Sequence, residues 1–270
     1  MLDNVISAVI EIILYLLLGS ISGILAGLFG IGGGIVIIPA LFYIFGYLEI
    51  SSLIIAHLVL GTSLGVIVFS SISSSLAHSR NLNVQWDLIK IVVPGIIIGS
   101  ALGGVTASYL ESETLKNLVS LFLIATALQM MFQFPPPDAS PNTNKVGPVL
   151  VGGFIGWLSG VFGIGGGIFS VPYFFHRGLG MKKSIGTSAV CGFPIAMAGS
   201  VSYMIVGFQD MELPEYTIGF VYLPAACVIG LVSMITAPIG ANIAIGINQK
   251  ALRRTFSLLI IIMALNLLLR

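Results

Sequence analysis

One glycine-rich phrase occurs twice in this chain. Residues 23–39 (the first glycine phrase) read GILAGLFGIGGGIVIIP, and residues 156–172 (the second glycine phrase) read GWLSGVFGIGGGIFSVP; eleven of the seventeen positions are identical at a constant offset of 133. Clustered glycines disfavour a continuous helix, because each one costs about 1 kcal/mol there relative to alanine. We therefore expect the chain to break in each phrase and to restart as a helix at Ile35 and at Ile168.

The start of such a helix offers chemistry suited to an anion. It presents unpaired backbone N–H groups and the positive end of the helix dipole. Glycine also lets a ligand approach the main chain closely. The candidate binding residues in the two phrases are Gly30, Gly32, Gly33, Gly34, Gly163, Gly165, Gly166 and Gly167.

Hydroxyl pairs form the second group of candidates. The tripeptide Gly-Thr-Ser occurs at 61–63 and again at 186–188, which puts Thr62, Ser63, Thr187 and Ser188 at equivalent points of the two halves. Hydroxyls can hydrogen-bond an oxyanion, but in membrane helices they more often bond their own backbone or a neighbouring helix. Both interpretations stay open.

Two ionisable residues within apolar segments are further candidates. His57 precedes Gly61 by one helical turn and so shares its face, and a histidine could couple proton movement to a transport step. The alternative is that His57 sits at the interface near the outer end of its segment. We give Glu11 less weight, because it lies only about two turns from the external end of its helix.

Composition sets the class of protein. Hydrophobic residues make up 57% of the chain and charged residues 8%, whereas a soluble domain carries about 25% charged residues. Many apolar runs approach the roughly 20 residues that cross a bilayer, so we predict an all-α polytopic membrane protein. Cys191 and Cys227 match neither a disulfide framework nor metal-ligand spacing. Asp3 and Glu11 precede any basic residue, unlike in a cleaved signal, so the first helix is expected to be retained.

The chain divides into two repeats of five segments. A first repeat (1–133) and a second repeat (148–270) flank a proline-rich linker (134–147). The ten predicted segments span approximately 5–28, 34–47, 53–77, 88–109, 114–133, 147–163, 167–177, 184–206, 217–246 and 251–269. An odd number per repeat makes the second repeat enter from the opposite face, an inverted topology common among secondary transporters. Eight full spans remain the alternative, with segments two and seven as re-entrant arms.

Charge tests this topology independently. If the loops alternate sides, one side receives nine basic residues: Arg80, Lys90, Lys145, Arg177, Lys182, Lys183, Lys250, Arg253 and Arg254. The other side receives only Lys116 and Arg270. The positive-inside rule then places the nine in the cytoplasm and both termini outside the cytoplasmic membrane.

Helix length and spacing assign two roles to the glycines. The helix expected from Ile35 to Gly46 is about 18 Å long, which is shorter than the roughly 30 Å hydrocarbon core of a bilayer. Short helices that follow breaks at equivalent points of both halves indicate a binding site at the membrane midplane. The alternative is two tight turns at the membrane surface. The remaining glycines recur every fourth residue and predict close helix packing; they are Gly19, Gly23, Gly27, Gly152, Gly156 and Gly160.

Competing glycine motifs do not fit. A phosphate-cradling loop needs Lys-Ser or Lys-Thr after its last glycine, but Ile35 and Ile168 follow here. A dinucleotide fingerprint needs a preceding strand in a soluble βαβ unit. We therefore expect no cofactor, no metal and no nucleic-acid partner, and a homo-oligomer is compatible with the sequence.

The doubled glycine phrase, the Gly-Thr-Ser after it and the loop from His78 to Trp86 resemble the TauE/SafE sulfite exporter family over essentially the whole chain. The resemblance implies a transporter in the cytoplasmic membrane that generally exports small sulfur-containing anions such as sulfite and organosulfonates. The residues that carry the resemblance are the glycines and hydroxyls above, with Pro39 and Pro172. The second half lacks a clear counterpart of the His78–Trp86 loop and has residues 206–216 there instead.

Three functions are consistent with these patterns. The first is a secondary transporter that exports a small anion by alternating access, alone or with a co-transported proton or cation. The second is a passive anion channel with the same glycine-lined path. The third, a membrane enzyme or assembly factor, would need a clustered nucleophile, metal site or acid–base pair, and the three histidines belong to different segments.

Overall fold

The structure is a computed structural model that describes residues 2–29, 33–80, 83–132, 146–208, 213–243 and 249–269. Gly30 and Gly32, both predicted site residues, lie outside this described part, as does most of the predicted linker.

Within the described residues the chain forms ten α-helices and one short hairpin. The first half contains α1 (Leu2–Phe29), α2 (Gly34–Tyr47), α3 (Ile55–Arg80), α4 (Trp86–Ser108) and α5 (Ser112–Phe132). The second half contains α6 (Val146–Phe162), α7 (Gly167–His176), α8 (Met181–Val206), α9 (Leu223–Ile243) and α10 (Gln249–Leu269). The hairpin pairs β1 (Thr217–Ile218) with β2 (Val221–Tyr222) in antiparallel register.

The ten predicted segments correspond to these ten helices, with one error. The sequence predicts a ninth segment over 217–246, but α9 begins only at Leu223 and residues 217–222 form the hairpin. Gly219 has a positive φ of 52° at the turn, which ends any helix there. Hydropathy cannot distinguish a short apolar strand from the first turn of an apolar helix.

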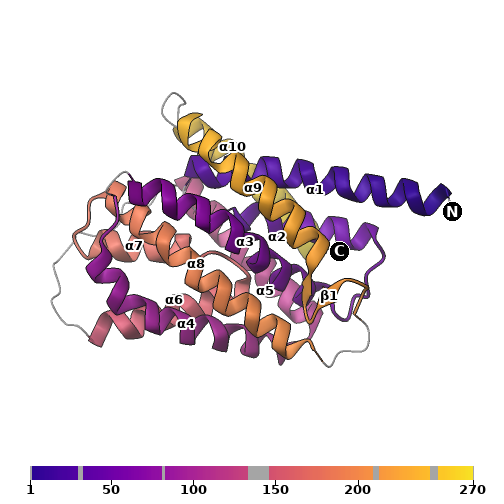
Figure 1. Cartoon of the computed structure of the whole chain (residues 1–270), viewed down its shortest axis with the longest axis horizontal. Coiled ribbons are helices and arrows are strands. Elements are labelled where there is room, and N and C mark those ends of the chain that lie inside the picture. Colours follow the sequence, from indigo (N-terminus) through magenta and orange to yellow (C-terminus); the bar gives the residue numbers. More distant parts are fainter. Residues whose placement is uncertain are drawn as a thin grey trace.

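Helices α3 and α8 pack against each other at the centre of the bundle. In Figure 1 they lie between the α4–α6 pair on one side and α1 with α9 on the other. The first helix of each half packs along the fourth helix of the other half, α1 on α9 and α6 on α4, and α5 packs on α10. Helix α1 begins and α10 ends toward the same end of the molecule (Figure 1).

Glycines explain how these helix pairs approach so closely. A Cβ at Gly152, Gly156 or Gly160 of α6 would collide with the carbonyls of Val92, Ile96 and Ser100, one helical turn apart on α4. A Cβ at Gly19 or Gly23 of α1 would collide in the same way with α9. The prediction that the four-residue glycine spacing serves close packing is confirmed at these five positions.

Six helices are long and apolar enough to cross a membrane, judged on the described residues: α1, α3, α4, α5, α8 and α9. The helices that follow the glycine phrases are much shorter. Helix α2 has 14 residues and α7 has 10, or about 21 and 15 Å of helix. Each is therefore shorter than the roughly 30 Å hydrocarbon core of a bilayer.

Candidate functional site

Each glycine phrase breaks at a glycine in the left-handed region. Gly33 has φ 74° and ψ −15° before α2, and Gly166 has φ 73° and ψ −9° before α7. The Gly33 carbonyl accepts hydrogen bonds from the N–H groups of Val36 and Ile37, and the Gly166 carbonyl accepts from the third and fourth residues after it. The predicted break is confirmed, and each helix restarts one residue earlier than expected. Only glycine adopts this conformation without a steric cost.

The two phrases touch each other inside the bundle. A Cβ at Gly34 would lie 3.4 Å from the Cα of Ile164, and 3.0 Å from Cδ1 of Ile67 on α3. Gly163, also at positive φ (66°), lies against the backbone of Leu60 on α3. The start of α2 therefore contacts the break between α6 and α7, with α3 beside both.

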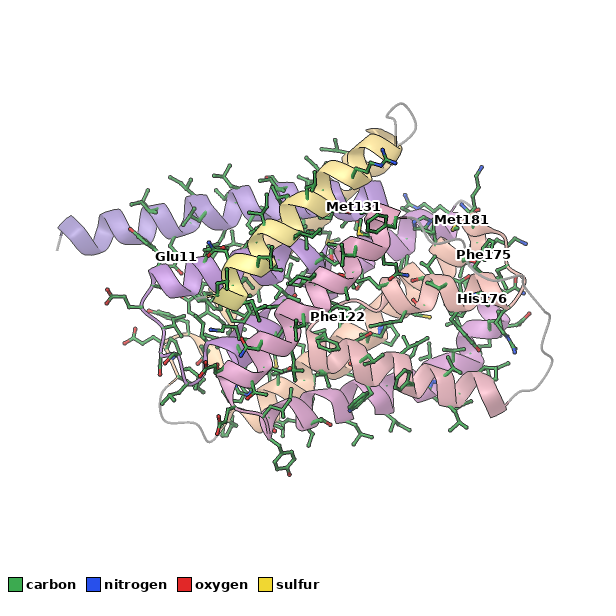
Figure 2. All side chains as sticks on the ribbon, turned by 180° about the vertical axis from the view of Figure 1, so that it is seen from behind. Glu11, Phe122, Met131, Phe175, His176 and Met181 are labelled. Atoms are coloured by element: carbon green, nitrogen blue, oxygen red, sulfur yellow. The ribbon has the colours of Figure 1, made fainter. Side chains whose placement is uncertain are left out.

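An aromatic side chain from α5 covers the second glycine phrase. Phe122 stacks on Phe162 at a ring-centroid distance of 4.3 Å and contacts Phe169 at 5.6 Å. Figure 2 shows Phe122 near the middle of the molecule, between its two ends. The second break consequently lies far from either end of the bundle.

The serines of the two Gly-Thr-Ser motifs bond to the second phrase from both central helices. Ser63 Oγ on α3 donates to the Gly163 carbonyl at 2.9 Å. The hydroxyls of Ser188 on α8 and Ser170 on α7 are 2.6 Å apart, and Ser170 donates to the Gly166 carbonyl at 2.9 Å. All three serines are buried. Sequence reasoning missed Ser170, although a serine four residues after a break glycine can bond back to its carbonyl.

The two threonines make matching bonds between the halves. The N–H of Tyr222, just before α9, donates to Thr62 Oγ1 at 3.0 Å, and the N–H of Gln85, just before α4, donates to Thr187 Oγ1 at 3.0 Å. The neighbouring glycines also correspond, because a Cβ at Gly61 would collide with the Phe220 backbone and one at Gly186 with the Asn83 backbone. Each threonine therefore holds the N-terminus of a helix from the other half. Gln85 and Tyr222 therefore make corresponding bonds, although the sequence of the second half shows no clear counterpart of the His78–Trp86 loop.

His57 holds the C-terminal end of α4. It is buried, its Nε2 lies 3.1 Å from the carbonyl oxygens of both Ala107 and Leu110, and its ring stacks on Phe220 with centroids 5.0 Å apart. A carbonyl oxygen only accepts, so Nε2 carries a hydrogen and donates. These contacts give His57 a structural role, and its coupling of protons stays a prediction.

Glu11 makes contacts that the sequence did not reveal. Its Oε1 accepts hydrogen bonds from Tyr15 Oη at 2.7 Å and from Tyr222 Oη at 2.9 Å. Tyr15 follows Glu11 by one helical turn, so this pair could have been expected from spacing. The bond to Tyr222 joins residues 211 positions apart in the chain, and no local pattern could predict it.

Two cavities open between the helices. One, of about 600 Å³, is lined by Gln85, by residues 178–180 of the loop after α7 and by residues 181–183 at the start of α8. The other, of about 230 Å³, lies where α2 meets α5 and α10 and includes Lys116. Among the described residues no three His, Cys, Asp or Glu side chains gather as metal ligands. The described site therefore offers hydroxyl groups and backbone amides.

Comparison with known proteins identifies the family. A model of the family described as sulfite exporter TauE/SafE matches residues 15–267. A probable membrane transporter protein of Haemophilus influenzae is 33% identical over 264 residues, which cover 96% of this chain and 98% of that protein. A probable membrane transporter protein of Methanocaldococcus jannaschii is 32% identical over 258 residues, or 95% of each chain. No solved structure matches the chain significantly.

These matches agree with the resemblance carried by the doubled glycine phrase, and the apolar helices described above fit a protein that crosses the membrane several times. The chain therefore belongs to the TauE/SafE family and is a multi-pass membrane transporter rather than an enzyme.

Proposed function

We propose that this protein is a secondary transporter that exports a small anion, sulfite or an organosulfonate, across the cytoplasmic membrane. The observation that carries the proposal is the contact between the two glycine phrases at Gly34 and Ile164. Each phrase contains a left-handed glycine that precedes a short helix, and the start of α2 lies against the break that precedes α7. The substrate class rests on the family description of sulfite export.

Alternating access between two inverted five-helix halves is the proposed mechanism. Three matched pairs of contacts support the inverted relation: α1 on α9 with α6 on α4, Thr62 with Thr187, and Gly61 with Gly186. Every pair joins one half to the other, as expected if a two-fold axis in the membrane plane relates them.

The proposed binding residues are the glycines of both phrases with the four hydroxyls of the Gly-Thr-Ser motifs. In this conformation Ser63 bonds to Gly163 and Ser188 to Ser170. A bound oxyanion would accept these two serine hydroxyls in place of their present partners, together with the first N–H groups of α2 and α7. The threonine oxygens accept the N–H groups of Tyr222 and Gln85, and their own O–H groups are the proposed donors to the anion.

Substrate flux into proteoliposomes tests the proposal. We expect Gly33→Leu and Gly166→Leu to abolish saturable sulfite or sulfonate flux, because a side chain at either glycine blocks the break and is strained at positive φ. Gly46→Leu is the matched control on α2, since a Cβ there meets nothing within 4 Å. A monodisperse size-exclusion profile establishes that each variant is folded. Wild-type flux in both phrase variants contradicts the proposal, and flux that never saturates favours a passive channel.

A further inference from the structure

The two left-handed glycines share one backbone conformation but have different neighbours. Gly33 and Gly166 are equivalent in the repeat and have nearly the same φ and ψ. A Cβ at Gly166 would lie 3.2 Å from the hydroxyl oxygen of Ser159 and would also meet the side chain of Ile195. A Cβ at Gly33 would instead lie 3.4 Å from the methyl carbon of Ala26. Ser159 and Ala26 are themselves equivalent, at the same offset of 133, so a hydroxyl in one phrase replaces a methyl group in the other.

A second pair of equivalent residues shows the same difference. Ser170 on α7 donates to the Gly166 carbonyl at 2.9 Å, and its oxygen lies 2.6 Å from the hydroxyl of Ser188. Since a hydroxyl carries a single hydrogen, Ser188 donates to Ser170. The equivalent of Ser170 on α2 is Ile37, whose Cδ1 would lie 3.7 Å from a Cβ at Gly33. An apolar side chain again stands where the second phrase has a hydroxyl.

Four serine side chains consequently surround the second phrase. Ser63 reaches it from α3 through its bond to the Gly163 carbonyl, and Ser159, Ser170 and Ser188 come from α6, α7 and α8. Each of the four is at most 1% exposed. A serine hydroxyl can turn about its Cβ–Oγ bond, so each can exchange its present acceptor for an anion.

The start of α2 has apolar neighbours instead. A Cβ at Gly34 would meet Ile67 on α3 and Ile164 of the second phrase, and both side chains are buried. The polar atom nearest to a Cβ at Gly33 is the backbone carbonyl oxygen of Ser22. A carbonyl oxygen only accepts hydrogen bonds, so it cannot donate to an anion. The two helix starts therefore differ in polarity although their backbones match.

We propose that the two glycine phrases bind opposite ends of the substrate. The oxygens of the anionic group face the break before α7, where the four serine hydroxyls donate to them, and the carbon group faces Ala26 and Ile37 beside the start of α2. This two-sided site rests on the proposed transport function and deepens it. It adds Ser159 and Ser170 as determinants of specificity, and it favours an organosulfonate over sulfite, which has no carbon group to bury.

The length of the carbon group tests the apolar side by binding alone. Methanesulfonate, ethanesulfonate and propanesulfonate carry the same anionic group and differ only in the number of methylenes. Their affinities for the purified full-length protein in detergent are measured by isothermal titration calorimetry. We expect affinity to rise about fourfold for each methylene that is buried. Equal affinity for the three sulfonates would overturn the two-sided site.

Exchanges between equivalent residues separate the two sides. Ser159→Ala gives the second phrase the methyl group of the first, and Ser170→Ala removes the other hydroxyl. We expect each to weaken all three sulfonates about tenfold, the equivalent of one hydrogen bond to a charged group. Ala26→Ser gives the first phrase the hydroxyl of the second, so most of the gain per methylene should be lost, because the carbon group then meets a polar atom.

Ser120→Ala on α5 is the matched control for these serine variants. Ser120 is also fully buried and donates to the Lys116 carbonyl one turn earlier in its own helix, so its loss should leave sulfonate affinity at the wild-type value. Monodisperse elution in size exclusion shows that each variant is folded.

Two results of this comparison overturn the two-sided site: wild-type affinity in both Ser159→Ala and Ser170→Ala, or an equal loss in Ser120→Ala. Sulfonate binding that follows the expected pattern without any flux in proteoliposomes refutes only the proposed transport. Wild-type protein that binds no sulfonate refutes both.

Discussion

In both Gly-Thr-Ser motifs the threonine and the serine make different kinds of hydrogen bond. The threonine hydroxyl accepts a backbone N–H from the other half, and the serine hydroxyl bonds toward the second glycine phrase, directly from Ser63 and through Ser170 from Ser188. Each threonine oxygen accepts a backbone N–H and keeps its own O–H as a donor, so the N–H bond does not by itself prevent contact with an anion. Ser63 and Ser188 already bond to the second phrase, so in the proposed site each would have to exchange its present partner for the anion.

Replacing Ser63 by alanine tests this exchange. The substitution removes one proposed donor to the anion, so we expect the KM for sulfite or sulfonate to rise about tenfold, the equivalent of one hydrogen bond to a charged group. Flux in proteoliposomes measures KM. Ser20→Ala on α1 is the control, because the hydroxyl of this half-buried serine donates to the Leu16 carbonyl one turn earlier in its own helix. A Ser63→Ala protein with unchanged KM would remove Ser63 from the proposed site.

The two threonines give a second test at the level of single residues. Thr62→Val and Thr187→Val keep the side-chain volume but leave a backbone N–H of Tyr222 or Gln85 without its acceptor. An unpaired buried donor costs about 1–3 kcal/mol, and we expect similar losses for the two variants because the bonds match. Thermal unfolding in detergent measures both. A loss in only one variant contradicts the matched roles of the two threonines.

Glycines let the backbones of the α4–α6 and α1–α9 pairs pack in direct contact. Along α4 and α6 the glycines of each helix face carbonyls of the other, which brings the backbones into contact and lets Cα–H groups approach carbonyl oxygens. Hydrophobic burial drives such contacts weakly when lipid surrounds the helices, so close backbone approach supplies the packing instead. Helices α1 and α9 make the same close backbone contact, so the two outer helix pairs pack in the same way.

A methyl group should disrupt this packing at one position of α6 and not at another. Gly156→Ala places a Cβ into the Ile96 carbonyl, and we expect a loss of about 1–3 kcal/mol in stability from overpacking. Gly147→Ala in the same helix meets nothing within 4 Å, so it should be neutral or stabilising by up to about 1 kcal/mol. Thermal unfolding of the two proteins decides between these outcomes, and equal stability would contradict the proposed role of the stripe.

Sequence reasoning predicted the helical architecture well because each relevant signal was local. The number of helices, the breaks at Gly33 and Gly166 and the packing stripes follow from hydropathy and glycine spacing within a few residues. It failed for residues 217–222, where a strand hairpin and a helix turn have the same apolar composition. It also missed the Glu11–Tyr222 bond, since pairing between residues distant in the chain depends on how the halves assemble.

At the scale of the whole molecule, the larger of the two cavities described above lies beside Gln85, and the smaller lies at the other end, between α2, α5 and α10. Basic residues gather at the Gln85 end, where Lys182 and Lys183 line the larger cavity. Their charge would raise the local concentration of an anion at this opening. If the proposed export and the predicted orientation hold, this cytoplasmic face is where the anion is expected to load.

Labelling in intact cells tests this orientation. Glu113→Cys and Lys182→Cys each place an exposed reporter near one end of the bundle, in protein without its native cysteines. Nine basic residues against two strongly favour retention of the Lys182 side in the cytoplasm. We therefore expect an impermeant maleimide to label Glu113→Cys in whole cells and Lys182→Cys only after permeabilisation. The reverse pattern would contradict the predicted orientation and place the Glu113 end of the bundle in the cytoplasm.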